Sequence, residues 1–329
     1  MTDTNSFRAV SVRRVDTKTY EFGGLRLSSS LDLPLLAALP AAAPNSDVDI
    51  HIGVSRSALP DGPLVHQSSG RFGLALHRLG SGWVFRHRDI GVVVDAEGLR
   101  LVCHCPRPSD GLLLAEILVR RILPKLCYRH GRLPLHAATL ANGAGGQGAR
   151  AAMLLGTSGS GKSTLTAALA RYRGWRIFGD DMSILDDRRH PAVLGGVAGV
   201  SLWQDAVDGL DIASDEIVSL AGYEGKYAYR PGAGPSAALP LTAIILLSVA
   251  TDADVIRLER LEGPEVLVML CSQIVPFNPR DVAESGDLMR RLGQVTRDVP
   301  VFALAYPRRY AKLSAVADAI ATLVDGPAS

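Results

Sequence analysis

The sequence predicts an α/β protein in two parts, a smaller, mainly β module over residues 1–128 and an α/β domain over residues 129–329. Short segments of alternating apolar and polar residues fill the first hundred positions, and turn signals such as Pro60-Asp61-Gly62 separate them. Further along the chain, apolar strands alternate with stretches of helix-forming composition. A chain of 329 residues has room for two domains of ordinary size.

Composition and charge exclude several classes of protein. Hydrophobic residues make up 47% and charged residues 21%, as in globular domains, and four cysteines do not form a disulfide framework. A net charge of +2 gives no general attraction to nucleic acid or to acidic membranes. Residues 1–14 lack the apolar core of a signal peptide, and the longest apolar run, 241–250, is far shorter than the roughly 20 residues that cross a bilayer. We therefore expect a cytoplasmic protein with neither a nucleic-acid nor a membrane partner.

A helix is expected after the β segments. It should begin at Asp110 as N-cap, because Leu113 and Ile117 follow at helical spacing. Pro124 should end or bend it, since proline lacks a backbone donor and its ring clashes with the preceding turn.

A hairpin and a third strand come next. Residues 135–140 are predicted as the first strand, Asn142-Gly143 as the start of a glycine-rich turn, and 151–155 as the returning strand. Helix-forming residues and a buried strand follow, and the rest of the chain mixes strands with helices. The further predicted strands are 175–178, 243–249, 255–258 and 301–304, and the predicted helices are 164–172, 265–271 and 311–323.

Residues 156–163 match the pattern G-x-x-x-x-G-K-[ST] at every fixed position. Glycines let the backbone turn tightly and aim N–H groups at phosphate oxygens, and the helix that follows adds its positive N-terminal dipole. In such a loop Lys162 reaches the β- and γ-phosphates, and the Ser163 hydroxyl joins the Mg²⁺ shell. An apolar strand before the loop and a helix after it strengthen the prediction that the cofactors are ATP and Mg²⁺. The residues expected to bind the nucleotide are Gly156, Thr157, Ser158, Gly159, Ser160, Gly161, Lys162, Ser163 and Thr164.

Two adjacent aspartates, Asp180 and Asp181, begin eighteen residues after Lys162. A helix of about three turns and a short strand fill this interval, so the strand that ends at the aspartates is expected beside the loop strand. One carboxylate can then bind the metal, and the other can accept the proton of an attacking hydroxyl. Neighbouring strand residues point to opposite faces, which indicates different roles, but the spacing does not decide which aspartate is the base.

Three further side chains are candidates with open alternatives. His136 lies on the strand expected to pair with the loop strand, and a lone histidine there is either a scaffold residue or a catalytic one. Lys226 and Arg230 either stabilise charge at the transferring phosphate or belong to a solvated basic loop.

The order of these motifs resembles the C-terminal catalytic domain of HPr kinase/phosphorylase, whose core is similar to that of ATP-dependent phosphoenolpyruvate carboxykinase. The shared features are Leu135-His136-Ala137, a hairpin, the loop and the aspartate pair, and the resemblance covers residues 130–320. It implies a P-loop kinase domain of this type. By the same resemblance, Asp180 is the catalytic base, Asp181 and Ser163 are metal ligands, and His136 contacts the γ-phosphate or orients the base.

The chain departs from HPr kinase after the aspartate pair. The family has a Glu-Ile-Arg-Gly-type segment there, whereas residues 195–203 contain no glutamate, so HPr itself is not the expected acceptor. Residues 202–206, 225–227 and 306–308 instead resemble HPr-kinase-related serine kinases that modify ribosomally made peptides, for example lasso-peptide precursors at a C-terminal serine. The resemblance implies transfer of the γ-phosphoryl group to a serine hydroxyl of a peptide or protein. Because HPr kinases form hexamers, a homo-oligomer is a further expectation.

Two other functions stay open. A small-molecule kinase of the shikimate-kinase type also has an acidic strand end shortly after its loop, although that loop usually lies near the N-terminus and about 150 residues precede it here. The second alternative is a non-catalytic regulator that binds ATP and signals through the N-terminal module. Whether that module docks the acceptor, and whether phosphorolysis also occurs, does not follow from the sequence.

Overall fold

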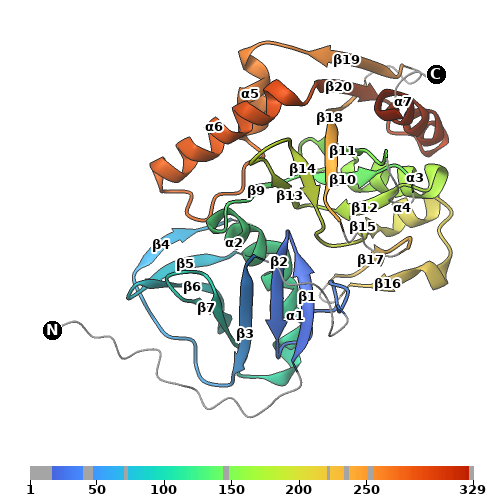
Figure 1. The fold of residues 1–329 in the computed structure, drawn as a ribbon. Helices are drawn as coiled ribbons and strands as arrows, with labels where there is room; N and C mark the ends of the chain where they lie inside the picture. The colour runs from blue at the N-terminus through green and yellow to red at the C-terminus, as the bar shows by residue number, and fades with distance from the viewer. Residues whose placement is uncertain are drawn as a thin grey trace.

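The computed structural model describes residues 17–39, 47–69, 73–143, 148–220, 223–232, 237–250 and 255–325. Over these residues the chain is a mixed α/β protein with three β-sheets and several helices (Figure 1). In the same part of the chain, no helix combines the length and the apolar character that a membrane crossing requires.

The first sheet contains eight strands in the order β1-β2-β3-β8-β7-β6-β5-β4. Strands β2, β3 and β8 run parallel to one another, and the other neighbours pair antiparallel. The short alternating segments of the sequence thus form strands, as predicted. Their bounds are Lys18–Phe22 (β1), Leu25–Ser29 (β2), Asp49–Ser55 (β3), Leu64–Gln67 (β4), Ala75–Leu79 (β5), Gly82–His87 (β6), Ile90–Val94 (β7) and Arg100–His104 (β8).

One helical segment follows the first sheet and includes a π-helical turn. Helix α1 (Gly111–Ile117) continues through the π-helical residues Leu118–Ile122 (η2) into α2 (Leu123–Arg129). Asp110 occupies the N-cap position, but its side chain makes no capping bond and pairs with Arg107 Nε at 2.7 Å. The sequence predicts that Pro124 ends or bends the helix, and the helix does not end there, because α2 continues to Arg129. Pro124 lies in the first turn of α2, and the wider π turn directly precedes it.

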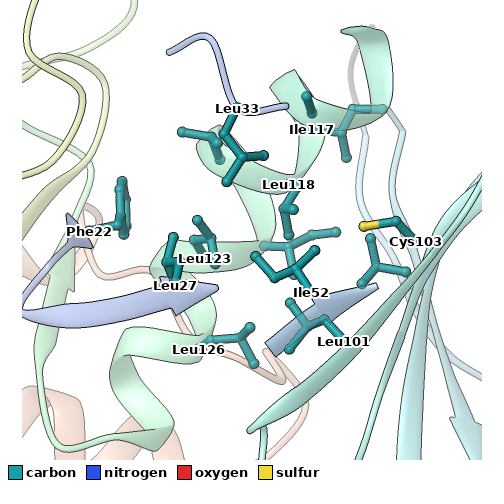
Figure 2. Close-up of a cluster of buried hydrophobic side chains, with 14 of the residues drawn as sticks. Phe22, Leu27, Leu33, Ile52, Leu101, Cys103, Ile117, Leu118, Leu123 and Leu126 are labelled. Atoms are coloured by element: carbon teal, nitrogen blue, oxygen red, sulfur yellow. The ribbon is translucent and has the colours of Figure 1, made fainter. Parts of the chain in front are cut away.

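The helical segment buries its apolar face against the first sheet. Leu118, Leu123 and Leu126 contact a cluster that includes Leu27 and Leu101 (Figure 2). Full burial of each such leucine stabilises the fold by about 1.5–3 kcal/mol. Three buried residues from further along the chain, Ile184, Val197 and Phe277, belong to the same cluster, so this core joins the first sheet to the second half of the chain.

The second sheet carries the glycine-rich loop of residues 156–163. Its order is β12-β10-β11-β18-β14-β13-β9, and β20 pairs with β18 and β19. Strand β11 runs parallel to β18, and β18 runs parallel to β20. The bounds are Leu133–Leu135 (β9), Ala138–Ala141 (β10), Ala151–Leu155 (β11), Arg176–Gly179 (β12), Ser183–Asp186 (β13), Ala192–Leu194 (β14), Leu239–Val249 (β18), Arg257–Leu261 (β19) and Val301–Tyr306 (β20).

Two details of this sheet differ from the sequence-based expectation. The predicted strand 135–140 is two strands, β9 and β10, separated by His136 and Ala137. Strand β12 pairs with β10, not with the loop strand β11, because the hairpin strand β10 already occupies that edge of β11. The aspartates therefore follow a strand that is one position further from the loop strand than expected.

Helices cover both faces of the second sheet (Figure 1). Helices α3 (Lys162–Arg173) and α7 (Leu313–Asp325) pack on one face, and α5 (Pro264–Cys271) and α6 (Val282–Asp298) pack on the other. Three of these helices were predicted, whereas α6 was missed. A small third sheet, β15-β17-β16, lies beside α3. Its first strand, β15, leads directly into the short helix α4. The bounds are Val200–Trp203 (β15), Gln204–Gly209 (α4), Ile217–Ser219 (β16) and Lys226–Tyr229 (β17).

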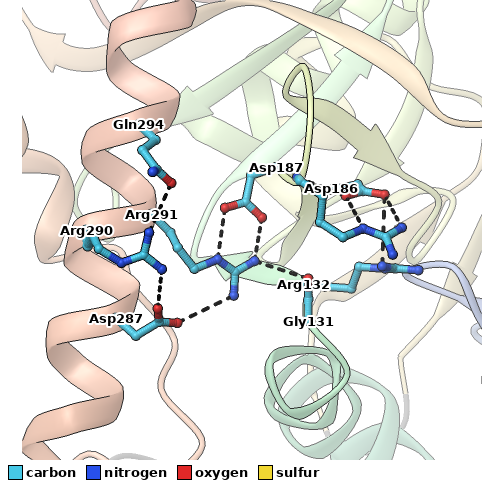
Figure 3. A network of polar contacts seen from close by, with 9 residues as sticks. Gly131, Arg132, Asp186, Asp187, Asp287, Arg290, Arg291 and Gln294 are labelled. Atoms are coloured by element: carbon cyan, nitrogen blue, oxygen red, sulfur yellow. Dashed lines mark hydrogen bonds and ion pairs between the residues drawn. The ribbon is translucent and has the colours of Figure 1, made fainter.

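A buried ion pair attaches α6 to the sheet. Arg291 makes a two-point contact with Asp187, which follows β13, and the distance from Nε to Oδ2 is 2.9 Å (Figure 3). Arg291 Nη2 also donates to the carbonyl oxygen of Gly131 at 3.2 Å. The Asp187 side chain is only 4% exposed and that of Arg291 11%, so neither charge has access to bulk water that could replace its partner.

We predict that Arg291→Met destabilises the protein by about 3–5 kcal/mol, because it leaves the Asp187 carboxylate buried without a counter-charge. The adjacent Arg290→Met is the matched control. Arg290 forms an exposed pair with Asp287 at 2.6 Å, and its loss should cost about 0–1 kcal/mol. Urea unfolding of the three proteins measures the difference. Equal, small losses in both variants would show that the Arg291 pair does not hold α6.

Candidate active site

The loop between β11 and α3 is a tight turn that a buried tyrosine holds in place. Gly161 has a φ of 93°, in the left-handed region that favours glycine, and a Cβ there would overlap the Tyr306 hydroxyl. Tyr306 Oη comes from β20 and donates to the carbonyl oxygen of Ser160 at 3.0 Å. The loop is therefore fixed from outside by a buried tyrosine, and α3 begins directly behind it with its N–H groups facing the loop.

Lys162 lies across the loop. Its Nζ donates to the carbonyl oxygens of Gly156 at 2.6 Å and Thr157 at 3.3 Å. The side chain is largely buried, and this burial lowers the lysine pKa. A phosphate oxygen is a charged acceptor and would form a stronger bond with the ammonium group than either carbonyl does.

Asp180 is buried directly after β12. Its Oδ1 accepts a hydrogen bond from Ser163 Oγ at 3.1 Å, and its Oδ2 accepts one from the backbone N–H of Ser201 at 2.9 Å. Burial, and next the charge of Asp181, raise the pKa of Asp180 to about 6, and the two hydrogen bonds oppose that rise. Asp180 thus joins β12, the start of α3 and β15.

Asp181 points in another direction because its backbone is left-handed, with a φ of 67°. Its Oδ1 lies 3.4 Å from Nε2 of His136, and its side chain is 41% exposed. The hydrogen bond from His136, together with Arg121 and Arg120 nearby, holds the pKa of Asp181 well below its usual range. The two aspartates therefore have different environments, as their adjacency predicted, but a backbone kink produces the difference and not strand alternation.

His136 lies between β9 and β10, and not on the strand that pairs with the loop strand as expected. Its backbone N–H donates to the carbonyl oxygen of Gln273 at 2.7 Å, which fixes this break between the strands. From there the imidazole reaches Asp181 across the end of the sheet.

A pocket of about 280 Å³ connects these groups. It gathers the predicted His136, Lys162, Ser163, Asp181 and Lys226 around the outer turn of the loop. Its lining residues are His136, Ser158, Gly159, Gly161, Lys162, Ser163, Thr164, Asp181, Ser201, Leu202, Trp203, Asp205, Ala206, Lys226 and Arg308.

Some predicted residues do not line this pocket. Gly156, Thr157 and Ser160 belong to the loop but are not among the lining residues, and Asp180 accepts a hydrogen bond from Ser163, which does line the pocket. Arg230 is elsewhere: its Nη1 donates to the carbonyl oxygen of Pro34 at 2.9 Å, in a separate apolar pocket. The prediction that Arg230 contacts the phosphate is not supported by this placement.

The structure also adds residues that sequence analysis did not assign to the site. Arg308 and Asp205 line the pocket, and the motifs 306–308 and 202–206 were the signal that could have found them. Arg120, on the helical segment after the first sheet, donates from Nη2 to Ser201 Oγ at 3.0 Å. No spacing in the sequence indicates that contact, because only the folded chain brings these residues together.

The residues present fit a magnesium ion that a nucleotide helps to hold. In the described part of the chain, no three His, Cys, Asp or Glu side chains converge as a metal site. Mg²⁺, however, commonly binds one or two protein oxygens and completes its shell with phosphate oxygens and water. Ser163 Oγ and Asp180 Oδ1, which are 3.1 Å apart, are oxygens of this kind beside the phosphate loop.

The chain matches no model of a known protein family, and no curated protein matches it in sequence. Its function must therefore be argued from the chemistry of the pocket.

We predict a pH-dependent effect of Asp180→Asn on stability. The free energy of unfolding of the variant, minus that of the unaltered chain, should be larger at about pH 8 than at about pH 4.5. The folded-state pKa of about 6 lies above the ordinary aspartate value of 3.8, so the native chain binds more protons between these values and loses stability as pH rises through them. Asparagine removes this titration, so the variant's advantage should grow with pH, by at most about 3 kcal/mol.

Thermal or urea unfolding at both pH values measures this difference. Asp298→Asn, at the exposed end of α6, controls for the loss of one carboxylate elsewhere on the protein. An advantage that does not change with pH would contradict the raised pKa of Asp180.

Proposed function

We propose that the chain is an ATP-dependent serine kinase that transfers the γ-phosphoryl group to a serine hydroxyl of a peptide or protein. Its second half would then be a P-loop kinase domain of the HPr kinase and phosphoenolpyruvate carboxykinase type. One observation carries this proposal: the phosphate loop, the Ser163–Asp180 pair and the His136–Asp181 pair meet at one pocket at the carboxyl ends of β11 and β12.

The loop and the start of α3 would bind the triphosphate. Backbone N–H groups and the helix dipole favour negative charge there, and Lys162 would leave its two carbonyl partners to contact the terminal phosphates. Ser163 and Asp180 would hold Mg²⁺, which neutralises charge on the phosphates when it is bound. The contribution of the protein is therefore mainly positioning and electrostatics.

The geometry favours Asp181 as the base, which reverses the roles implied by the resemblance to HPr kinase. Both oxygens of Asp180 already accept hydrogen bonds, from Ser163 and Ser201, and the residue lies behind the pocket. Asp181 faces the pocket, and its lowered pKa keeps it ionised at neutral pH. In this mechanism the serine oxygen attacks the γ-phosphorus, the bond to the β–γ bridging oxygen breaks, ADP leaves, and the serine proton moves to Asp181.

His136 would act through Asp181. Its Nε2 is 3.4 Å from the Asp181 carboxylate, so the imidazole orients that group toward the pocket and stabilises its charge. Lys226 also lines the pocket and would stabilise negative charge on the transferring group.

We predict that Lys162→Ala weakens ATP binding by at least about tenfold, since hydrogen bonds to charged groups contribute about 1.5–3 kcal/mol each. Lys18→Ala is the matched control, because Lys18 is an exposed lysine of β1 paired only at the surface, with Asp32 at 2.9 Å. Calorimetric titration with ATP and Mg²⁺ measures both affinities. Normal ATP binding by the Lys162 variant would show that residues 156–163 are not a nucleotide loop.

Substitutions of the two aspartates should impair different steps of the reaction. We predict that Asp181→Asn still binds ATP and Mg²⁺ but transfers phosphate about 10²–10⁴-fold more slowly, as expected for a lost general base. Asp180→Asn should weaken ATP binding only when Mg²⁺ is present. Single-turnover transfer to serine peptides, with ATP affinities measured with and without Mg²⁺, separates the variants. If Asp181→Asn transferred phosphate normally, the base would have to be another group.

A further inference from the structure

An apolar pocket lies between the segment after β2, helix α1 and the third sheet. Its volume is about 280 Å³, and it is the pocket in which Arg230 contacts Pro34. The walls come from residues that follow β2, from the start of α1, and from β16 and β17 with the residues directly after them. A cavity of about 150 Å³ can hold a benzene molecule, so this pocket has room for a large aliphatic or aromatic side chain.

The walls of this pocket are mainly apolar and partly open to water. Leu112 on α1 is 58% exposed, and Val218 on β16 is 71% exposed. Val218 lies directly opposite Ala228 in the pairing of β16 with β17, so the two side chains share one face of the sheet. Large apolar side chains that are exposed together around a hollow are typical of a ligand site.

The charged groups of the pocket already have partners. Arg230 Nη1 donates to the carbonyl oxygen of Pro34 at 2.9 Å, and Glu116 Oε1 lies 3.5 Å from Arg120 Nε. Glu116 and Arg230 contribute one negative and one positive charge, so the lining of the pocket has no excess charge. The pocket therefore favours an apolar group over a charged one.

The apolar pocket adjoins the candidate active site. A small pocket of about 20 Å³ shares Glu116 and Leu220 with the apolar pocket. The same small pocket shares Asp181, Ser201 and Lys226 with the pocket at the phosphate loop. An acceptor whose hydroxyl faces Asp181 can thus extend through this row of adjoining pockets into the apolar one.

Strand β17 gives the length of this path. Lys226, which begins β17, lines the pocket at the phosphate loop, whereas Ala228 and Arg230 line the apolar pocket. A strand rises about 3.3 Å per residue, so about 7–13 Å separates the two pockets along β17. An extended peptide covers this distance in about two to four residues.

The edge of the third sheet favours a peptide as the occupant. Among the residues that the structure describes, β16 pairs with β17 alone, and its outer edge has no strand partner. The N–H and C=O groups at such an edge can bond the backbone of an extended chain. A small metabolite has no repeating backbone with which to use them.

We infer that the apolar pocket is a specificity pocket of the kinase, which binds a large apolar side chain about two to four residues from the acceptor serine. We call this pocket the apolar subsite. The inference rests on the proposed function and adds a feature of the acceptor that is separate from the serine itself. Burial of the side chain in the subsite strengthens binding of the acceptor and leaves the phosphoryl transfer step unchanged.

The test scans phenylalanine against alanine through a serine peptide that the protein phosphorylates. Each position from five residues before the serine to five residues after it is varied in turn. At one position, about two to four residues from the serine, phenylalanine should lower KM at least about tenfold relative to alanine, as expected for full burial of a large apolar side chain. The value of kcat should stay the same, because the contact is made equally before and during transfer.

Two exposed residues of the subsite provide the variant. Leu112→Gln/Val218→Thr should remove most of the preference by raising KM for the phenylalanine peptide, with KM for the alanine peptide unchanged. Because both residues are mostly exposed, their replacement should not unfold the protein. The matched control is Met289→Gln/Val268→Thr, whose residues are 46% and 72% exposed on α6 and α5 and line none of the three pockets. The control should keep the preference.

Several results would overturn the apolar subsite. They are equal KM values for phenylalanine and alanine at every position, a preference confined to the residue directly beside the serine, and an unchanged preference in the Leu112→Gln/Val218→Thr protein. Sedimentation of both double variants tests another occupant. If the subsite variant alone dissociates an oligomer, a second copy of the chain fills the pocket and the inference is wrong.

Failure of the kinase proposal can be recognised separately. If ATP binds but no peptide is phosphorylated, the proposed function is wrong. The subsite is then tested by binding of fluorescent serine peptides, each with one phenylalanine or one alanine at a scanned position, to the full chain with a non-hydrolysable ATP analogue. Tighter binding of a phenylalanine peptide that Leu112→Gln/Val218→Thr abolishes supports the subsite, and equal binding of the two sets overturns it.

Discussion

The burial of the Asp180 carboxylate is the constraint on which the site depends. A charge removed from water must find partners, and Asp180 takes one from α3, the Ser163 hydroxyl, and one from β15, the Ser201 N–H. These two bonds connect three elements around the end of β12. Burial, and next the charge of Asp181, raise the pKa of Asp180. The next carboxylate turns away from it, because Asp181 has a positive φ and pairs with His136. The two adjacent aspartates thus occupy separate environments with different partners.

The same constraint means that the charged residues of the site lower the stability of the folded protein. The carboxylates of Asp180 and Asp181 repel one another beside the loop. The ammonium group of Lys162 contacts backbone carbonyls, and burial of this side chain lowers its pKa. A nucleotide with its metal ion would relieve both conditions, since the metal offers positive charge to Asp180 and the phosphates offer negative charge to Lys162. Local conflicts that a ligand can resolve are what a functional site is expected to contain.

Sequence patterns predicted what local geometry determines and missed what only the folded chain determines. The loop, the helix behind it and the strand before it follow from glycines and apolar runs, and the structure contains them as α3 and β11. The position of β12 beside β10, the break at His136 and the contact of Arg120 with Ser201 join residues far apart in sequence, so no spacing reveals them. Helix α6 is a different kind of miss, because the apolar spacing of its residues 288, 292 and 295 was present in the sequence.

The helical segment after the first sheet makes that sheet part of the site. Its leucines are buried against the sheet (Figure 2). Its π-helical turn contains Arg120 and Arg121, which line a pocket together with Asp181. A shift of this helix would move Arg120, and with it Ser201, which supplies one of the two hydrogen bonds to Asp180. The helical segment is therefore linked through Ser201 to Asp180, which we propose as a metal ligand. By fixing the helix, the first sheet also constrains the position of that carboxylate.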